Sequence, residues 1–283
     1  MVRLFSGEGK NETRTPAVAN MFYPGSPDEL KSMIQKFMEN THKIPVDEKP
    51  IGLIVPHAGY VYSGQIAATA YKQIEGMNFD TVIMLGVSHR SGINGASVYK
   101  SGTYETPLGS VEIDRDLASI MMDKSDMFTF QPKAHAAEHS LEVQVPFLQS
   151  VIKNFKILPI LMGYWSEVVC SHVSESIIDS IGEKNILIVA STDMSHYYPY
   201  DTARRMDNVA LSSIKNMDTR KLMADLGAKR CELCGAAPVI TTLMTAKKMG
   251  AEKLEILQYA NSGDVTGDKT DGVVGYFAAA IYK

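Results

Sequence analysis

Short, continuous apolar runs alternate with longer amphipathic segments along most of the chain. Runs of this length without polar interruption are typical of strands buried on both faces of a parallel sheet. The pattern predicts such strands at residues 51–55, 81–85, 156–161 and 185–190, and two later strands at residues 254–259 and 273–281. The third prediction is the weakest, because Pro159 lacks the N–H that a ladder inside a sheet requires.

Helical patterns fill most of the gaps between these runs. Ser26, Pro27 and Glu29 form a capping-box start, so we expect a helix from there to about Glu39. Ser63 is expected to cap a second helix, shortly after the first strand. Further helices are predicted at residues 166–181, 202–215, 219–226 and 235–249.

Strands that alternate with helices predict an α/β fold, with a largely parallel central sheet and helices on both faces, in α/β/α layers. Residues 95–113 break the alternation with short pieces around Gly102, Pro107 and Gly109, and we expect a small antiparallel excursion there. Neither a linker nor a shift in composition divides the chain. We therefore expect one domain over residues 1–283.

Composition narrows the class of protein. The 283 residues are 45% hydrophobic and 21% charged, which excludes disorder as the main state. A net charge of −4 argues against nucleic acid or an anionic membrane as partner. The apolar stretch 273–281 is shorter than the ~18 residues of a membrane span. Residues 1–10 show no secretory signal, and three cysteines are too few for a disulfide framework, so we expect a cytoplasmic protein.

Three histidines follow predicted strands closely. His57, His89 and His196 each lie within six residues of the end of a buried run. Because the carboxyl ends of parallel strands meet at one edge of a sheet, these imidazoles are expected to converge there. Imidazole ligates divalent transition metals and titrates near neutral pH, so the cluster suits a metal site or acid–base chemistry. Asp193, in the loop that carries His196, could orient an imidazole or bind metal itself.

Cys234 stands just before a predicted helix, where free amides and the helix dipole favour a thiolate. A thiolate is the soft ligand that would join two imidazoles on Fe(II), Cu or Zn. Cys231 makes this a Cys-x-x-Cys pair, but a zinc ribbon needs a second pair that Cys170 alone cannot supply. A buried structural cysteine is the alternative.

A competing pattern is His135-Ala136-Ala137-Glu138-His139, which matches the inverted zinc-peptidase signature H-x-x-E-H. On a helix, the two histidines would face one way and Glu138 would act as the base. The alternative is a polar helix entry. Tyrosines also flank the strand-end histidines and are candidates for lining a substrate pocket. They are Tyr60, Tyr62, Tyr197 and Tyr198.

Taken together and in order, six short motifs resemble those of the Memo family, whose prokaryotic members are called AmmeMemoRadiSam system protein B. The motifs are Pro16-Ala17-Val18-Ala19 with Phe22-Tyr23-Pro24, Pro56-His57-Ala58-Gly59-Tyr60 with Tyr62-Ser63-Gly64, Gly86-Val87-Ser88-His89, Glu138-His139-Ser140-Leu141-Glu142, Ser191-Thr192-Asp193-Met194-Ser195-His196 and Cys234-Gly235-Ala236-Ala237-Pro238. They extend from residue 16 to about residue 240, nearly the whole chain.

The resemblance implies a fold related to the class III extradiol dioxygenases of the LigB type, with a non-haem metal site. By position it implies His57, His89 and Cys234 as metal ligands and His196 as the acid–base residue. Asp193 and His139 become neighbours in the pocket. The dioxygenases carry a carboxylate where this family has cysteine, which argues against ring cleavage, since a thiolate donates more charge and is itself oxidisable.

Three functions follow as hypotheses. The first is a metal-dependent redox protein with Fe(II) or Cu, or else Zn, and an unidentified substrate. The second is a non-catalytic scaffold that binds a peptide or a partner protein, since animal members of the family are associated with receptor signalling. The third is the zinc peptidase. The name of the prokaryotic group further implies radical-SAM and AMMECR-type partners.

Overall fold

The computed structural model describes residues 13–46 and 48–283. Within these described residues, nine strands form a central sheet in the order β10-β12-β2-β9-β3-β8-β4-β7, with β11 paired to β12. Its middle consists of four parallel strands, β2 (Gly52–Val55), β9 (Ile186–Ser191), β3 (Thr81–Val87) and β8 (Lys156–Met162). The predicted α/β fold with a mostly parallel sheet is confirmed.

Antiparallel strands complete the sheet at both edges. On one side lie β12 (Val273–Tyr282), β11 (Lys253–Asn261) and β10 (His196–Tyr198). On the other, β4 (Ala96–Val98) runs antiparallel to β8 and pairs with β7 (Phe128–Thr129). A separate small sheet holds the hairpin of β5 (Thr103–Thr106) and β6 (Gly109–Glu112), with β1 (Thr13–Arg14) alongside. This hairpin and β4 are the antiparallel excursion expected within residues 95–113.

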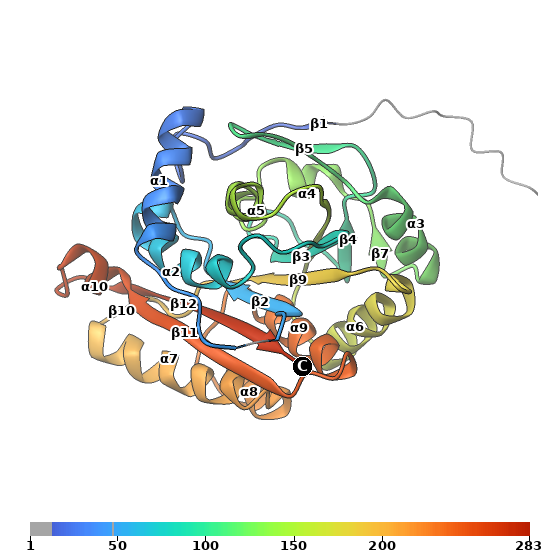
Figure 1. Cartoon of the computed structure of the whole chain (residues 1–283). Coiled ribbons are helices and arrows are strands. Elements are labelled where there is room, and N and C mark those ends of the chain that lie inside the picture. The colour runs from blue at the N-terminus through green and yellow to red at the C-terminus, as the bar shows by residue number, and fades with distance from the viewer. Residues whose placement is uncertain (1–12, 47) are drawn as a thin grey trace, which may run out of the picture.

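Two apolar cores cover the two faces of the sheet, because successive side chains of a strand point to opposite sides. Leu53 and Val55 pack into one core and Ile54 into the other. The first core is covered by α1 (Pro27–Glu39), α2 (Tyr60–Gln73), α4 (Pro132–Ala136), the 3₁₀ turn η1 (Glu142–Gln144) and α5 (Val145–Val151). The second is covered by α3 (Arg115–Lys124), α6 (Glu167–Ile181), α7 (Tyr200–Lys215), α8 (Thr219–Gly227) and α9 (Ala236–Lys248). Figure 1 shows the two layers, with the short α10 (Ser262–Thr266) beyond one edge.

Of two local predictions, the strand that contains Pro159 is confirmed and the helix cap at Ser63 is not. Residues 156–162 form β8 despite Pro159, because the burial of the flanking apolar side chains outweighs one missing N–H donor. The Pro159 carbonyl still accepts a hydrogen bond from the Tyr99 N–H at 2.9 Å. The predicted cap at Ser63 is wrong. Helix α2 begins at Tyr60 behind Gly59, and the Ser63 hydroxyl lies inside the first turn, donating to the Ala58 carbonyl at 2.9 Å.

None of the helices in the described part of the chain combines the length and apolarity that crossing a bilayer requires. Residues 1–10, in which no secretory signal is expected, lie outside the described residues.

Candidate metal centre

Two imidazoles and a sulfur meet at the carboxyl edge of the parallel strands. His57 follows β2 by two residues and His89 follows β3 by two, while Cys234 stands directly before Gly235, the N-cap of α9. One donor atom from each of the three lies within 4.8 Å of the others. The Cys234 Sγ is 3.2 Å from His57 Nε2, and the two imidazole rings meet edge to face with centroids 5.1 Å apart. The structure thus brings together the three residues expected as metal ligands.

The hydrogen bonds of Ser191 orient His57. The Ser191 hydroxyl gives its one proton to the Ser140 carbonyl at 2.6 Å, so toward His57 Nδ1, 2.9 Å away, it can only accept. His57 therefore carries its proton on Nδ1 and leaves Nε2 bare on the side of Cys234. Burial, then the neighbouring His139 and His89, hold the pKa of His57 well below its usual value, so the ring is neutral.

A carboxylate orients His89 in the same sense. Glu138 Oε1 lies 2.9 Å from His89 Nδ1, and Oε2 accepts the His89 backbone N–H at 2.7 Å. Burial alone would raise the pKa of Glu138, but hydrogen bonds from His89 and Ser140 outweigh it and lower the pKa to about 2. An ionised carboxylate only accepts, so His89 Nδ1 carries a proton and Nε2 is the ring nitrogen left for a ligand.

The loop after β9 holds Cys234 in place. The Asp193 backbone N–H donates to Cys234 Sγ at 3.2 Å, and the Asp193 side chain accepts the His57 N–H at 2.8 Å. Burial raises the pKa of Asp193 to about 7, although the His57 and Ala58 N–H groups act against it. Burial, and then the charge of Asp193, also raise the pKa of the Cys234 thiol. A bound cation would supply the positive charge that a thiolate needs at this position.

The other predicted site residues lie at different depths. His139 stacks on His89, with centroids 4.5 Å apart, and burial lowers its pKa to about 4. His196 is half-buried at the start of β10, and its pKa is lowered by burial. Tyr197 is 78% exposed beside it, at a ring distance of 6.0 Å. Tyr60 lies in the core instead of a pocket, and its hydroxyl donates to the Val143 carbonyl at 2.6 Å.

The inverted zinc-peptidase arrangement does not form. Helix α4 ends at Ala136, so His135 and His139 do not share a helical face. His135 is buried, with Nε2 bonded to Ser97 and Nδ1 3.1 Å from the Tyr104 hydroxyl, so both of its nitrogens are used. Glu138 is likewise engaged by the imidazoles and is not free to act as a base. His135 is a satisfied core histidine.

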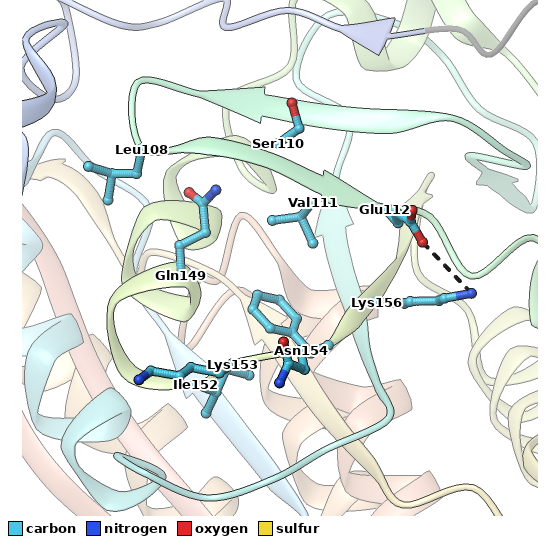
Figure 2. A pocket seen from close by; sticks show the side chains of 10 residues that line it. Leu108, Ser110, Val111, Glu112, Gln149, Ile152, Lys153, Asn154 and Lys156 are labelled. Carbon is cyan, nitrogen blue, oxygen red and sulfur yellow. Dashed lines mark ion pairs between the residues drawn. The ribbon is translucent and has the colours of Figure 1, made fainter.

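A cavity of about 460 Å³ opens onto Cys234 and His89, with Arg90, Trp165 and Leu233 among its lining residues. Figure 2 shows another hollow, of about 590 Å³, lined by β6, the end of α5 and the start of β8, where Lys156 pairs with Glu112 at 3.9 Å. It lies at the opposite, amino-terminal edge of β8 and has neither histidine nor cysteine among its lining residues. The first cavity is therefore the one that bears on the candidate metal centre.

Three residues that shape the site have no such role predicted from the sequence. The sequence pattern gives Glu138 only the role of a peptidase base, and it gives no separate role to Ser191 or to Phe22, whose ring lies 4.7 Å from that of His139. The one available signal was their presence within the ordered motifs.

Known proteins match this chain over nearly its whole length. The family model described as Memo-like protein matches residues 14–280. A MEMO1 family protein of Methanocaldococcus jannaschii is 39% identical, over 96% of this chain and 99% of that protein. Its counterparts in Methanopyrus kandleri and Saccharolobus solfataricus are 37% and 38% identical, over 95% and 94% of this chain and 99% and 98% of their own lengths.

Proposed function

The chain belongs to the Memo-like family, and on that premise we propose that it is a metal-dependent redox protein whose cation is held by His57, His89 and Cys234. The observation that carries the proposal is the meeting of three donor atoms within 4.8 Å. In both imidazoles Nδ1 is hydrogen-bonded to another side chain, which leaves Nε2 as the nitrogen for a metal. Such bare nitrogens are what a metal ion requires of histidine.

The donor set selects the class of metal. Two imidazoles with one thiolate suit Fe(II) or Cu, with Zn as a further candidate, whereas Mg²⁺ and Ca²⁺ prefer oxygen ligands. When bound, iron or copper would supply one-electron chemistry and Lewis acidity at this edge of the sheet. The sulfur is the distinctive donor, since it is held by a backbone N–H and lies against an imidazole.

In this proposal, the neighbouring residues move protons and hold the ligands. His196 is the acid–base residue, because it is a half-buried imidazole that begins β10, at the end of the loop that carries Asp193. Asp193 fixes the backbone of His57 and the position of the sulfur. The cavity beside His89 and Cys234 admits a small molecule to the centre.

Anaerobic titration with Fe(II), Cu(I) and Zn(II), followed by spectroscopy, tests the proposal on protein purified without a histidine tag. We expect one tight site in the wild type, a thiolate–metal signature, and loss of both in Cys234→Ser. Cys231→Ser is the matched control, since it removes a buried thiol three positions away and should leave binding intact. Equal metal content in wild type and Cys234→Ser would rule out this ligand set. Absence of metal and of oxygen consumption would favour the peptide-binding scaffold.

A further inference from the structure

The carboxylate of Glu138 lies against the imidazoles of His89 and His139, and both of its oxygens accept hydrogen bonds. Oε1 is 2.9 Å from His89 Nδ1 and 3.3 Å from His139 Nδ1, and it also accepts the Ser140 N–H at 2.9 Å. Oε2 accepts the His89 N–H at 2.7 Å. The side chain is only 1% exposed. Glu138 therefore holds both the ring and the backbone of His89.

We propose that Glu138 is a positioning residue, which fixes the tautomer and ring orientation of His89 so that its Nε2 faces the centre. This inference rests on the proposed function, because it assigns His89 the role of a ligand. Its physical basis is that a carboxylate cannot donate, so the His89 Nδ1 that is hydrogen-bonded to it must carry the proton. Partners of this kind, hydrogen-bonded to the far nitrogen of a ligating histidine, orient it and raise its basicity.

A buried ion pair stabilises the turn that carries Glu138 but, among the described residues, makes no hydrogen bond to His89. Arg14 donates to the Glu138 carbonyl at 2.7 Å and to the His135 carbonyl at 3.2 Å, and it pairs with Glu142. Glu142 also accepts the N–H groups of Ala17 and Val18. Arg14 therefore contacts the segment of residues 135–142 at both of its ends. No bond joins Glu142 to an imidazole in the described residues, so Glu142 serves as a matched buried carboxylate.

The same three side chains, His89, Glu138 and His139, could instead hold a cation of their own, since their donor atoms also lie within 4.8 Å of one another. The hydrogen-bond pattern favours the positioning role. Two backbone N–H groups already occupy Glu138, and the 2.9 Å between Glu138 Oε1 and His89 Nδ1 is an ordinary N–H···O distance with no room for an ion between the atoms.

The test compares Glu138→Gln with Glu142→Gln in the full chain, using anaerobic Co(II) as the probe metal and ¹⁵N NMR of the histidine rings. In wild-type protein without metal, His89 should show a protonated Nδ1 and a bare Nε2. Glu138→Gln should give a mixture of tautomers and a Co(II) affinity lower by about 10- to 100-fold. Glu142→Gln should lower the melting temperature but leave the tautomer and the Co(II) affinity as in wild type.

The outcomes separate the inference from the proposed function. A folded Glu138→Gln variant with the wild-type tautomer and affinity would overturn the positioning role. Protonation of His89 on Nε2 in the wild type would overturn it as well, and that measurement does not depend on the variant's folding. If the wild type binds neither Co(II) nor the Fe(II), Cu(I) and Zn(II) of the earlier titration, the proposed function fails, while the ¹⁵N comparison still decides whether Glu138 sets the tautomer.

Discussion

His57 Nδ1 and Ser191 Oγ lie 2.9 Å apart, and the serine is the acceptor because its own proton goes to the Ser140 carbonyl. The chain of bonds continues inward. Gln144 donates to the same hydroxyl at 2.9 Å and accepts the Tyr71 hydroxyl at 2.9 Å. Each bond is buried, and each has a single allowed direction. The orientation of His57 is therefore coupled to the apolar core beneath the sheet.

Replacing Ser191 by alanine should loosen this coupling. His57 and Gln144 would lose an acceptor and Ser140 a donor, which should reduce the free energy of unfolding by about 1–3 kcal/mol. Metal affinity should fall by about 10-fold or more, because His57 could then adopt the other tautomer. Urea denaturation and metal titration measure the two effects.

The matched control is Ser174→Ala. The Ser174 hydroxyl is also buried, but it finds no hydrogen-bond partner within the described part of the chain. Its removal should leave the free energy of unfolding unchanged or raise it. Equal losses in the two variants would contradict the directional role of Ser191.

Gly235 is required by the close approach of two loops. A Cβ placed there would lie 2.7 Å from Thr192 Cβ and would also collide with the Ser191 carbonyl oxygen. Gly235→Ala should therefore push the Cys234 turn away from the β9 loop, costing about 1–3 kcal/mol of stability and weakening metal binding. Thermal unfolding and metal titration check this.

Gly227, the last residue of α8, offers the contrasting case, because a Cβ there meets nothing within 4 Å. Gly227→Ala should be neutral or stabilising by about 0.4–1 kcal/mol. If Gly235→Ala behaves in the same way, the packing of these loops is not what places Cys234.

Arg14 should be among the most sensitive charged positions. It is 4% exposed and pairs with the fully buried Glu142, so Arg14→Ala would leave an uncompensated charge inside the protein. We expect a loss of about 3–5 kcal/mol in the free energy of unfolding. Lys248→Ala, which breaks the exposed pair with Glu175, should show no measurable loss. A small effect of Arg14→Ala would mean that the amino-terminal segment contributes little to the fold.

The pH dependence of stability should report His135. Burial lowers its pKa to about 4, so below the usual pKa of histidine the unfolded chain takes up a proton that the folded protein does not. Stability should fall as the pH falls. From about pH 7.5 to about pH 5.5, this group alone should remove about 1.4 kcal/mol.

His135→Gln keeps a donor and an acceptor at this position but does not titrate. Its free energy of unfolding should therefore decrease less over the same range than that of the wild type, by about the same 1.4 kcal/mol. Other imidazoles titrate in both proteins and cancel in the difference. Identical pH profiles in chemical denaturation would show that His135 titrates alike in the folded and the unfolded chain, so that burial does not lower its pKa.

The sequence by itself determined the succession of strands and helices, because burial on a pleated strand or on one side of a helix leaves a periodic trace in neighbouring residues. The runs at 51–55, 81–85 and 185–190 became adjacent parallel strands. From that topology, the meeting of His57 with His89 at one edge could be expected. The cap at Ser63 could not be placed correctly, since either Gly59 or Ser63 would satisfy the local pattern.

Only the tertiary structure decided which side chains complete the centre. Cys234 lies 177 residues from His57 in the chain, and the packing of α9 against the sheet brings its sulfur to the imidazole. Which of His135 and His139 lies near the centre could likewise not be predicted from the sequence. The turn between them places His135 in the core and His139 against His89. The tautomers depend on Ser191 and Glu138, 134 and 49 residues away from the rings they orient. Hydrogen-bond direction is set by groups that meet only in the folded chain, so no local pattern encodes it.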